Sequence, residues 1–321
     1  MSSLVIQTSF LGDVVLTTPL LAELASRGPV DVVVTPAAAA LLANHPAVRD
    51  LLVFDKRGAD AGMAGLWRFA RGLRRRSDGT TREIAAAYLA QGSMRSASLA
   101  LFAGIRERVG FDSSAGRVLY TRRSRYRGNR HHAERLWRLA AGDAAPDPAP
   151  EVIRPRLYPG ERERAAVDAL LKDVPRDGAQ LLALAPGSIW GTKRWPHFPA
   201  LAAEIARASG PERVINATGK LSLLASTELL SRCAALVTND SAPQHLASAA
   251  GTPTLTIFGP TAPEFGFGPL APRHSTIGNE SLTCRPCHPH GPRVCPLGHW
   301  KCMRELEVEQ VSRALNSLLL P

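Results

Sequence analysis

The first strand-to-helix turn of the chain contains an acidic residue that could act as a base. The turn runs Thr8-Ser-Phe-Leu-Gly-Asp13 between a short apolar run and a segment of helical spacing. The Asp13 carboxylate could accept a proton from a substrate hydroxyl, and Gly12 lets a ligand approach the backbone closely. The alternative is that Asp13 only caps the helix. The spacing is not G-x-G-x-x-G, so the turn lacks the fingerprint of a dinucleotide site.

A second turn, Ala185–Pro196, has the composition of a phosphate-binding loop. It contains Gly187, Ser188 and Thr192, and Lys193 follows close to the start of a helix. Backbone N–H groups, hydroxyls and an ammonium at a helix N-terminus together suit a phosphate. The Walker A spacing is not met, so an ordinary strand-to-helix turn remains the alternative.

Two later turns carry further polar residues at the ends of predicted strands. Asp240 and Ser241 precede a helix in which His245 lies about one turn in, and Gly259 and Thr261 follow the next strand. Because carboxyl ends of parallel strands meet at one sheet edge, we expect these turns to converge there with the phosphate loop. Their combination favours a diphosphate-bearing ligand.

Four of the five cysteines lie within 19 residues near the C-terminus. Their spacing is Cys284-x2-Cys287-x7-Cys295-x6-Cys302. Four thiolates could hold a structural zinc ion or an iron–sulfur cluster, and the alternative is a loop of reduced, partly buried thiols.

The net charge of +11 is unevenly distributed over the 321 residues, with most of the excess before residue 150. The stretch from Arg117 to Arg138 alone has eight arginines and one acidic residue, Glu134. Such a stretch suits an anionic partner, which could be nucleic acid, anionic lipid or a phosphorylated substrate. A solvated basic face is the alternative.

The elements that position these turns alternate between apolar runs and helical segments, which indicates an α/β fold with parallel sheets. Strands are predicted first at 4–7, 30–35, 51–54 and 85–89, and again at 181–185, 214–217, 235–238 and 254–258. The segment 140–159 interrupts this rhythm. Its central part, 142–150, is rich in proline, and we interpret the whole segment as the linker between two domains. We therefore predict two doubly wound, Rossmann-like domains facing across a cleft, at residues 1–145 and 146–321.

The composition and the apolar runs argue against a disordered protein and against a membrane-spanning protein. Hydrophobic residues make up 45% and charged residues 21%, which is typical of globular proteins. The longest apolar runs are far shorter than the ~20 residues of a membrane span. The N-terminal residues 1–7 read as a strand rather than a secretory signal, so a cytoplasmic protein is expected.

In combination, the ordered motifs resemble the ADP-heptose–lipopolysaccharide heptosyltransferases of glycosyltransferase family 9, which have the GT-B fold. The resemblance rests on segments 9–19, 186–196, 239–247 and 258–261 and covers nearly the whole chain. The Cys-rich segment, from Cys284 through Cys295-Pro-Leu-Gly-His299 to Cys302, looks most like the heptosyltransferase II branch.

The resemblance implies an inverting transfer of heptose from ADP-heptose to the inner core of lipopolysaccharide. Asp13 would be the general base on the acceptor hydroxyl, and Lys193 would neutralise the departing ADP phosphates. No cofactor is expected to be needed, since no Asp-x-Asp motif for Mg²⁺ occurs. The remaining donor-side residues would be Gly12, Gly187, Ser188, Thr192, Asp240, Ser241, His245, Gly259 and Thr261.

The implied acceptor is a phosphorylated lipid A carrying Kdo and heptose, bound by the basic first domain. Arg122, Arg123 and Arg125 are the candidate acceptor residues, and we expect the protein to work peripherally on the inner face of the inner membrane. No nucleic acid partner is expected.

Two departures from the family pattern stand out. Ala242 occupies a position where the family usually has glycine. The stretch between Trp195 and Val214 is also short, because a strand and a glycine-rich turn that usually help to hold the adenosine have no counterpart.

Two alternatives remain open at this point. One is a GT-B transferase that uses another nucleotide sugar. The other is a metal-stabilised nucleic-acid-binding protein, suggested by the arginine stretch and the cysteines, although no aromatic stacking motif accompanies them.

Overall fold

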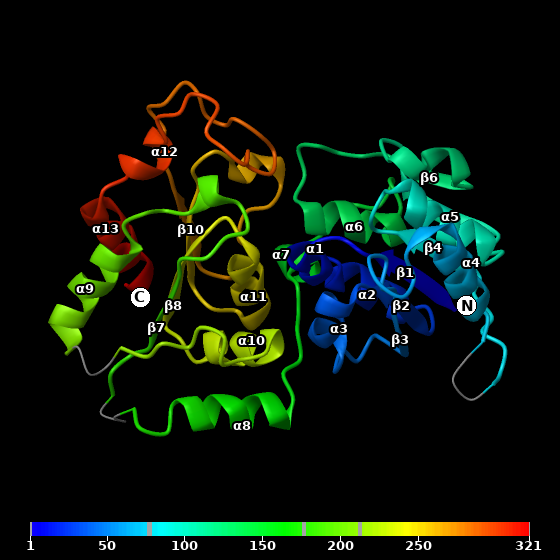
Figure 1. The fold of residues 1–321 in the computed structure, drawn as a ribbon, viewed down its shortest axis with the longest axis horizontal. Helices are drawn as coiled ribbons and strands as arrows, with labels where there is room; N and C mark the ends of the chain where they lie inside the picture. Colours follow the sequence, from blue (N-terminus) through cyan, green and yellow to red (C-terminus); the bar gives the residue numbers. More distant parts are fainter. Residues whose placement is uncertain (1, 76–78, 175–177, 211–213, 321) are drawn as a thin grey trace. The chain divides into compact units, whose positions relative to one another are not determined.

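The computed structural model describes residues 2–75, 79–174, 178–210 and 214–320. These residues form two compact units (Figure 1). The first contains residues 1–128 and 132–158, and the second contains residues 129–131 and 159–321.

The first unit is built on a six-stranded parallel sheet with the strand order β3-β2-β1-β4-β5-β6. The order reverses beside β1, so the turn that follows β1 lies at a topological switch point, where α/β sheets bind ligands. The strands are β1 (Ser3–Gln7), β2 (Val30–Val34), β3 (Asp50–Val53), β4 (Ala86–Leu89), β5 (Glu107–Phe111) and β6 (Arg122–Ser124).

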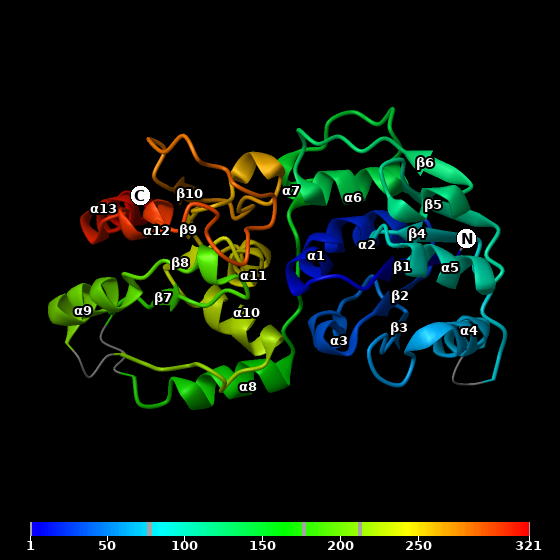
Figure 2. The same ribbon diagram turned by 45° about the horizontal axis from the view of Figure 1, so that its top comes forward.

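Helices connect these strands and cover both faces of the sheet (Figures 1 and 2). Leu4 and Ile6 of β1 pack with Leu66 and Leu99, so two of the helices cover one face. Val5 points to the other face and is also completely buried. The helices are α1 (Leu11–Leu16), α2 (Thr18–Ala25), α3 (Pro36–Leu42), α4 (Gly62–Gly72), α5 (Met94–Phe102), the 3₁₀ helix η1 (Ala115–Leu119), α6 (His132–Ala141) and α7 (Pro150–Ile153).

The second unit has a four-stranded parallel sheet with the order β10-β9-β8-β7. Its strands are β7 (Leu182–Ala185), β8 (Ala235–Asn239), β9 (Thr254–Ile257) and β10 (His274–Ile277). Its helices are α8 (Glu161–Leu170), the 3₁₀ helix η2 (Gly191–Lys193), α9 (Phe198–Ser209), α10 (Leu223–Ser231), α11 (Ala242–Ala250), the 3₁₀ helix η4 (Pro263–Phe265), α12 (Lys301–Arg304) and α13 (Val308–Leu319).

The predicted strand at 214–217 is wrong. Residues 214–217 have no regular structure, and Val214 is 61% exposed. The sheet therefore ends at β7, whose four residues are all only half-buried. The apolar Val-Ile pair suggested a strand, but no neighbouring strand pairs with it, and strand pairing is what stabilises an extended segment.

The first unit continues past residue 145, where the sequence analysis divided the chain. The proline-rich segment is held against α6, because Arg138 donates to the Ala145 carbonyl at 2.8 Å and pairs with Asp147 at 2.7 Å. The unit then extends to Tyr158, whose ring packs edge-on against His45 with the ring centroids 4.9 Å apart.

The core of the second unit lies between its sheet and the C-terminal helix α13. Trp195, Phe198 and Leu255 pack there with Val311 and Leu315. Across the described ranges, none of the helices combines the length and apolar content that a bilayer crossing requires.

Candidate active site

Asp13 lies in the first turn of α1, directly after the central strand β1. Its carboxylate accepts a hydrogen bond from Ser9 Oγ at 2.7 Å. His132 Nε2, at the start of α6, lies 3.8 Å from the other carboxylate oxygen. The Asp13 side chain is 19% exposed, so a substrate hydroxyl can reach it while most of the group is held by the protein.

The interpretation of Asp13 as a helix cap is wrong. Phe10 occupies the N-cap position and makes no side-chain capping bond, and Asp13 is the third residue of the helix. Its carboxylate is positioned by the Ser9 hydroxyl instead of binding the helix backbone. That leaves the carboxylate turned toward a hydroxyl and an imidazole, as proton transfer requires.

A buried network fixes the backbone of this turn. Gln7 donates to Thr17 Oγ1 at 3.0 Å, and Thr17 Oγ1 donates to the Asp13 carbonyl at 2.7 Å. Gln7 Oε1 also accepts from the Ser9 N–H at 3.3 Å. Gly12, between these residues, lies within α1.

Sequence reasoning missed Ser9 and His132 as neighbours of Asp13. The spacing of Ser9 and Asp13, four residues apart around a helix start, is a signal that could have found the first contact. His132 is 119 positions away in the chain, so only the packing of α6 beside α1 brings it there.

The candidate acceptor arginines lie at the edge of the first sheet. Arg122 and Arg123 are on β6, Arg125 follows it, and all three are exposed. Strands β4 and β5 separate β6 from β1. Arg122 pairs with Glu107 at 3.3 Å, and the Arg125 N–H binds Asp143 at 3.0 Å.

The arginine stretch is not one solvated basic face. Arg135 and Arg138 of α6 are each only 2% exposed. Arg138 pairs with Glu134 at 2.9 Å, and Arg135 bonds the hydroxyl of Tyr126 and lies over its ring. Burial lowers the pKa of Arg135. These two arginines hold the first unit together and are not available to an anionic partner.

In the second unit, three segments of the chain place a side chain against the carboxylate of Asp240. Lys193 Nζ lies 2.6 Å from Asp240 Oδ2, and both side chains are about nine-tenths buried. Thr261 Oγ1 donates to the same oxygen at 2.8 Å. Gln244 donates to Oδ1 at 3.3 Å. The predicted convergence of the phosphate loop with the two later turns is therefore present in this unit.

Asn239, the last residue of β8, ties the phosphate loop to the strand. Its amide donates to the Pro186 carbonyl at 2.8 Å and accepts from the Trp195 N–H at 3.0 Å. Ser241 Oγ donates to the Gly187 carbonyl at 3.2 Å. The side chain of Ser241 therefore links two turns and does not cap α11, although Ser241 occupies the N-cap position.

Ala242, where the resembled family usually has glycine, is the first residue of α11. Alanine is well suited to a helical backbone, so this departure introduces no strain. His245 lies in the same helix and is 6% exposed.

The Cys-rich loop covers the phosphate loop. Thr192 Oγ1 donates to the Pro292 carbonyl, and a Cβ atom on Gly291 would lie 2.9 Å from Lys193 Cε. At the other end of the loop, Arg285 donates to the carbonyls of Phe258 and Gly259. Sequence reasoning missed the roles of Gln244 and Arg285, although both lie within segments that carried the resemblance, because spacing alone does not show which side chain of a segment reaches a neighbouring turn.

Ser188 and Gly259 have local roles in these turns. Ser188 Oγ accepts from the Trp190 N–H at 3.3 Å. A Cβ atom on Gly259 would lie 2.5 Å from the sulfur of Met303, so a larger residue there would have to displace the Met303 side chain of α12.

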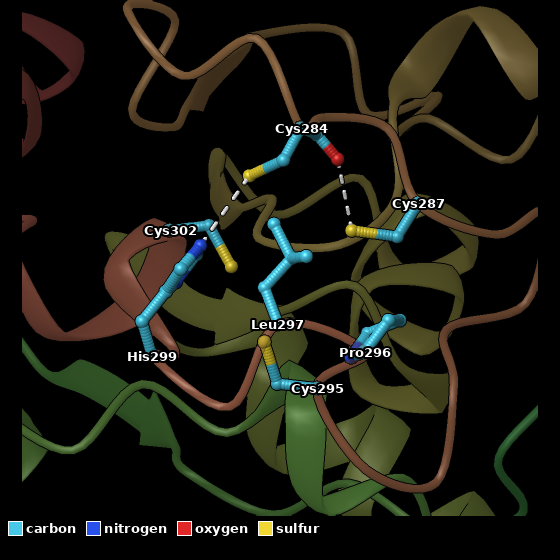
Figure 3. Close-up of a pocket in the computed structure, with 7 residues that line it drawn as sticks. All are labelled: Cys284, Cys287, Cys295, Pro296, Leu297, His299 and Cys302. Carbon is cyan, nitrogen blue, oxygen red and sulfur yellow. Dashed lines mark hydrogen bonds between the residues drawn. The ribbon is translucent and has the colours of Figure 1, made fainter.

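Cys284, Cys287, Cys295 and Cys302 line one pocket of about 240 Å³ together with Pro296, Leu297 and His299 (Figure 3). Cys284 Sγ lies 3.9 Å from His299 Nε2, and Cys287 Sγ donates to the Cys284 carbonyl at 3.0 Å. Within the described residues, however, no three His, Cys, Asp or Glu side chains are grouped as ligands of one metal ion. The four thiols therefore line one pocket without meeting at a single point.

The thiols differ in acidity. Burial raises the pKa of Cys302 to about 11. Partial burial opposes ionisation of Cys295 too, but backbone hydrogen bonds from Trp300 and its neighbours outweigh it and lower the pKa. Cys233 follows the C-terminal end of α10 and is half-buried, and burial raises its pKa to about 11.

A family model described as Glycosyltransferase family 9 (heptosyltransferase) matches residues 67–209 and 199–300. The chain belongs to glycosyltransferase family 9. It is therefore a glycosyltransferase. The two polar clusters, one around Asp13 in the first unit and one around Asp240 in the second, belong to a family 9 enzyme.

Curated relatives extend this match over most of the chain. Lipopolysaccharide heptosyltransferase 1 of Pseudomonas aeruginosa is 31% identical over 320 residues, which cover 89% of this chain and 86% of the relative. Lipooligosaccharide heptosyltransferase 2 of Haemophilus influenzae is 26% identical over 307 residues, with 83% and 85% covered.

Solved structures of family 9 members have the same fold. A family 9 glycosyl transferase from Veillonella parvula has a TM-score of 0.84 at 23% identity, with 99% of this chain and 97% of that chain covered. The Escherichia coli ADP-heptose lps heptosyltransferase II has a TM-score of 0.77 at 22% identity, with 99% and 98% covered. The predicted GT-B fold is confirmed.

Proposed function

We propose that the protein is an inverting heptosyltransferase that uses ADP-heptose and extends the inner core of lipopolysaccharide, in the manner of heptosyltransferase II. The observation that carries the proposal is the Asp13 carboxylate, held by Ser9 and still accessible at the switch point of the first sheet. Relatives named as heptosyltransferases of lipopolysaccharide or lipooligosaccharide support the substrate class.

Asp13 acts as the general base in this proposal. The acceptor hydroxyl gives its proton to Asp13 while its oxygen attacks the anomeric carbon of the donor, and the bond from that carbon to the ADP oxygen breaks. The attack on the opposite face from the leaving group inverts the anomeric centre. Ser9 holds one carboxylate oxygen of Asp13, which orients the other toward the hydroxyl.

In this proposal the Lys193–Asp240 pair binds the phosphates and a sugar hydroxyl of the donor. A lysine ammonium has three N–H donors, and the pair with Asp240 uses one, so the others can bind the ADP phosphates as negative charge develops. Asp240 accepts from Lys193, Thr261 and Gln244, which leaves acceptor capacity for a hydroxyl of the donor sugar. The proposed donor site is completed by three neighbouring segments. They are the phosphate loop with Gly187, Ser188 and Thr192, the segment with Ser241 and His245, and the turn with Gly259.

The proposed acceptor is a phosphorylated lipid A bearing Kdo and heptose, which the first unit would bind with Arg122, Arg123 and Arg125. Such an acceptor implies a cytoplasmic enzyme that works peripherally on the inner face of the inner membrane. The exposed position of the three arginines supports this assignment.

The donor is tested with purified protein, a deacylated inner-core acceptor, and ADP-heptose beside UDP- and GDP-sugars. We expect heptosylated product and release of ADP only with ADP-heptose. Release of UDP with sugar transfer would instead identify a GT-B transferase for another nucleotide sugar.

A structural zinc ion on Cys284, Cys287, Cys295 and Cys302 remains a separate proposal, with no part in the chemistry. It requires the thiols to move from the pocket walls to one point. Elemental analysis of the purified protein tests it: one zinc per chain supports the site, and a zinc-free protein with reduced thiols excludes it.

A further inference from the structure

Two adjacent helices of the first unit expose large apolar side chains. On α4, Met63 is 65% and Trp67 is 52% exposed, and on α5, Leu101 is 38% and Phe102 is 40% exposed. The two helices pack side by side (Figures 1 and 2). The exposed apolar and arginine side chains of these two helices and of the residues that follow them are together called the α4–α5 face. They are Met63, Trp67, Arg68, Arg71, Arg74, Arg75, Met94, Arg95, Leu101, Phe102 and Arg106.

This exposure does not come from poor packing of the helices. Leu66 and Ala70 of α4 and Leu99 of α5 are at most 3% exposed in the core of the unit. Met63, Trp67 and Arg71 are spaced four residues apart, so they form one outward stripe on α4. The guanidinium of Arg71 lies 4.6 Å from the centre of the Trp67 ring.

The charge of the α4–α5 face is almost entirely positive. Residues 61–75 and 92–106 include no acidic residue and six arginines, all of which are exposed. Among the described residues that directly flank these two segments, Asp60 lies 3.7 Å from Arg68, and Glu107 pairs with Arg122. Within the described part of the chain, Arg74 and Arg95 donate to backbone carbonyls rather than to carboxylates.

Apolar side chains among exposed arginines match an anionic lipid surface. Tryptophan and other large apolar groups enter the boundary between headgroups and acyl chains, while arginines bind lipid phosphates. Both charge and apolar surface are complementary to that partner.

We propose that the α4–α5 face docks the protein on an anionic phospholipid bilayer. The proposal rests on the proposed function in one respect, since an acceptor anchored in a membrane requires the enzyme to reach it there. It assigns that contact to a surface outside both polar clusters.

Sedimentation with vesicles tests the proposal. The full chain is mixed with vesicles of phosphatidylcholine alone, or of phosphatidylcholine with phosphatidylglycerol. We expect the protein to pellet with the anionic vesicles and not with the neutral ones. We expect Met63→Gln/Trp67→Gln to weaken binding about tenfold or more, because two apolar side chains that would be buried in the bilayer are lost. Arg71→Glu/Arg106→Glu should weaken it at least about fivefold.

A matched control changes an apolar residue exposed elsewhere on the same unit. Val152 on α7, which packs against α6, is 45% exposed, and Val152→Gln should bind vesicles as the wild type does. Equal loss in this control, unchanged binding of the Met63/Trp67 variant, or equal binding of wild type to neutral vesicles would overturn the proposal. So would a Met63/Trp67 variant that only changes the oligomeric state in size-exclusion chromatography.

Failure of the proposed function is read separately. Transfer of heptose to a deacylated acceptor needs no bilayer, so the Met63/Trp67 variant should keep wild-type activity on it. Vesicle binding without heptose transfer by the wild type would reject the proposed function alone, and transfer without vesicle binding would reject the docking surface alone.

Discussion

At the level of single residues, the buried pair of Lys193 and Asp240 organises the proposed donor site. A buried ion pair is held only where further hydrogen bonds satisfy its polar atoms, and Thr261 and Gln244 provide them. The pair therefore couples local stability to the proposed neutralisation of the leaving group.

Lys193→Met should damage both stability and activity. It leaves the Asp240 carboxylate buried without a cation, which costs about 3–5 kcal/mol of unfolding free energy. It also removes charge stabilisation of the leaving group, so kcat should fall by about 10²–10³. Chemical denaturation and initial-rate kinetics measure the two effects.

The double variant Lys193→Met/Asp240→Asn separates these effects. Removing both charges should restore much of the stability but none of the activity. If the single variant unfolds at the same denaturant concentration as the wild type, the pair does not have the structural part assigned to it.

At the scale of elements, the Cys-rich loop packs against the proposed donor site. It contacts the phosphate loop through Gly291 and Pro292, and the turn after β9 through Arg285. The thiol pocket lies in the same loop. The loop therefore serves the site by packing, whether or not it binds a metal.

Gly291→Ala tests this packing. Gly291 has a φ of +82° and lies against Lys193. Alanine there is strained by about 1–2 kcal/mol and displaces the Lys193 side chain, so we expect KM for the donor to rise.

Gly298→Ala is the matched control for this substitution. Gly298 lies in the same loop with a φ of +69°, and nothing lies within 4 Å of the added Cβ atom. It should show the backbone strain alone, with KM unchanged. Equal kinetic effects of the two variants would show that the Lys193 contact is unimportant.

The sequence predicted the elements better than the contacts between them. Runs such as 30–35 and 235–238 predicted β2 and β8 because strands buried on both faces are continuously apolar. The same rule failed at 214–217, where no described strand pairs with the segment. Strand β10 was missed because three of its four residues, His274–Thr276, are polar and it lies at the edge of the sheet.

The same contrast between predictable elements and unpredictable contacts holds for the site residues. Asp240, Lys193 and Thr261 could be predicted to meet, because each ends or follows a parallel strand. The contact of His132 with Asp13 and the burial of Arg135 depend on how α6 packs, which local spacing does not encode.

At the scale of the whole molecule, stability depends on a buried histidine in the first unit. Burial lowers the pKa of His45 to about 4, below its usual 6.5. The unfolded chain therefore binds a proton at a higher pH than the folded protein does. The unfolding free energy should fall as pH decreases from about 6.5 to about 4, by up to about 3 kcal/mol from this group.

His45→Asn tests the pH dependence. The asparagine oxygen can replace the ring nitrogen that accepts from the Ala47 N–H at 3.2 Å, but it does not titrate. Denaturation measured at several pH values should give a weaker dependence in the variant between pH 4 and 6.5. An identical slope would exclude His45 as its source.

The structure separates the arginines of the first unit into buried and exposed groups, which the sequence alone did not distinguish. Two arginines of the 117–138 stretch are structural. The exposed arginines that accompany apolar side chains lie instead on α4 and α5, where we propose contact with lipid.

The central claim is that Asp13 is the base for heptosyl transfer, and one measurement tests it most directly. Asp13→Asn keeps the shape of the side chain and can still bond Ser9, but it cannot take a proton. With ADP-heptose and a deacylated acceptor, kcat should fall by about 10²–10⁴, while ADP binding measured by calorimetry stays unchanged. Transfer at the wild-type rate by Asp13→Asn would contradict the account.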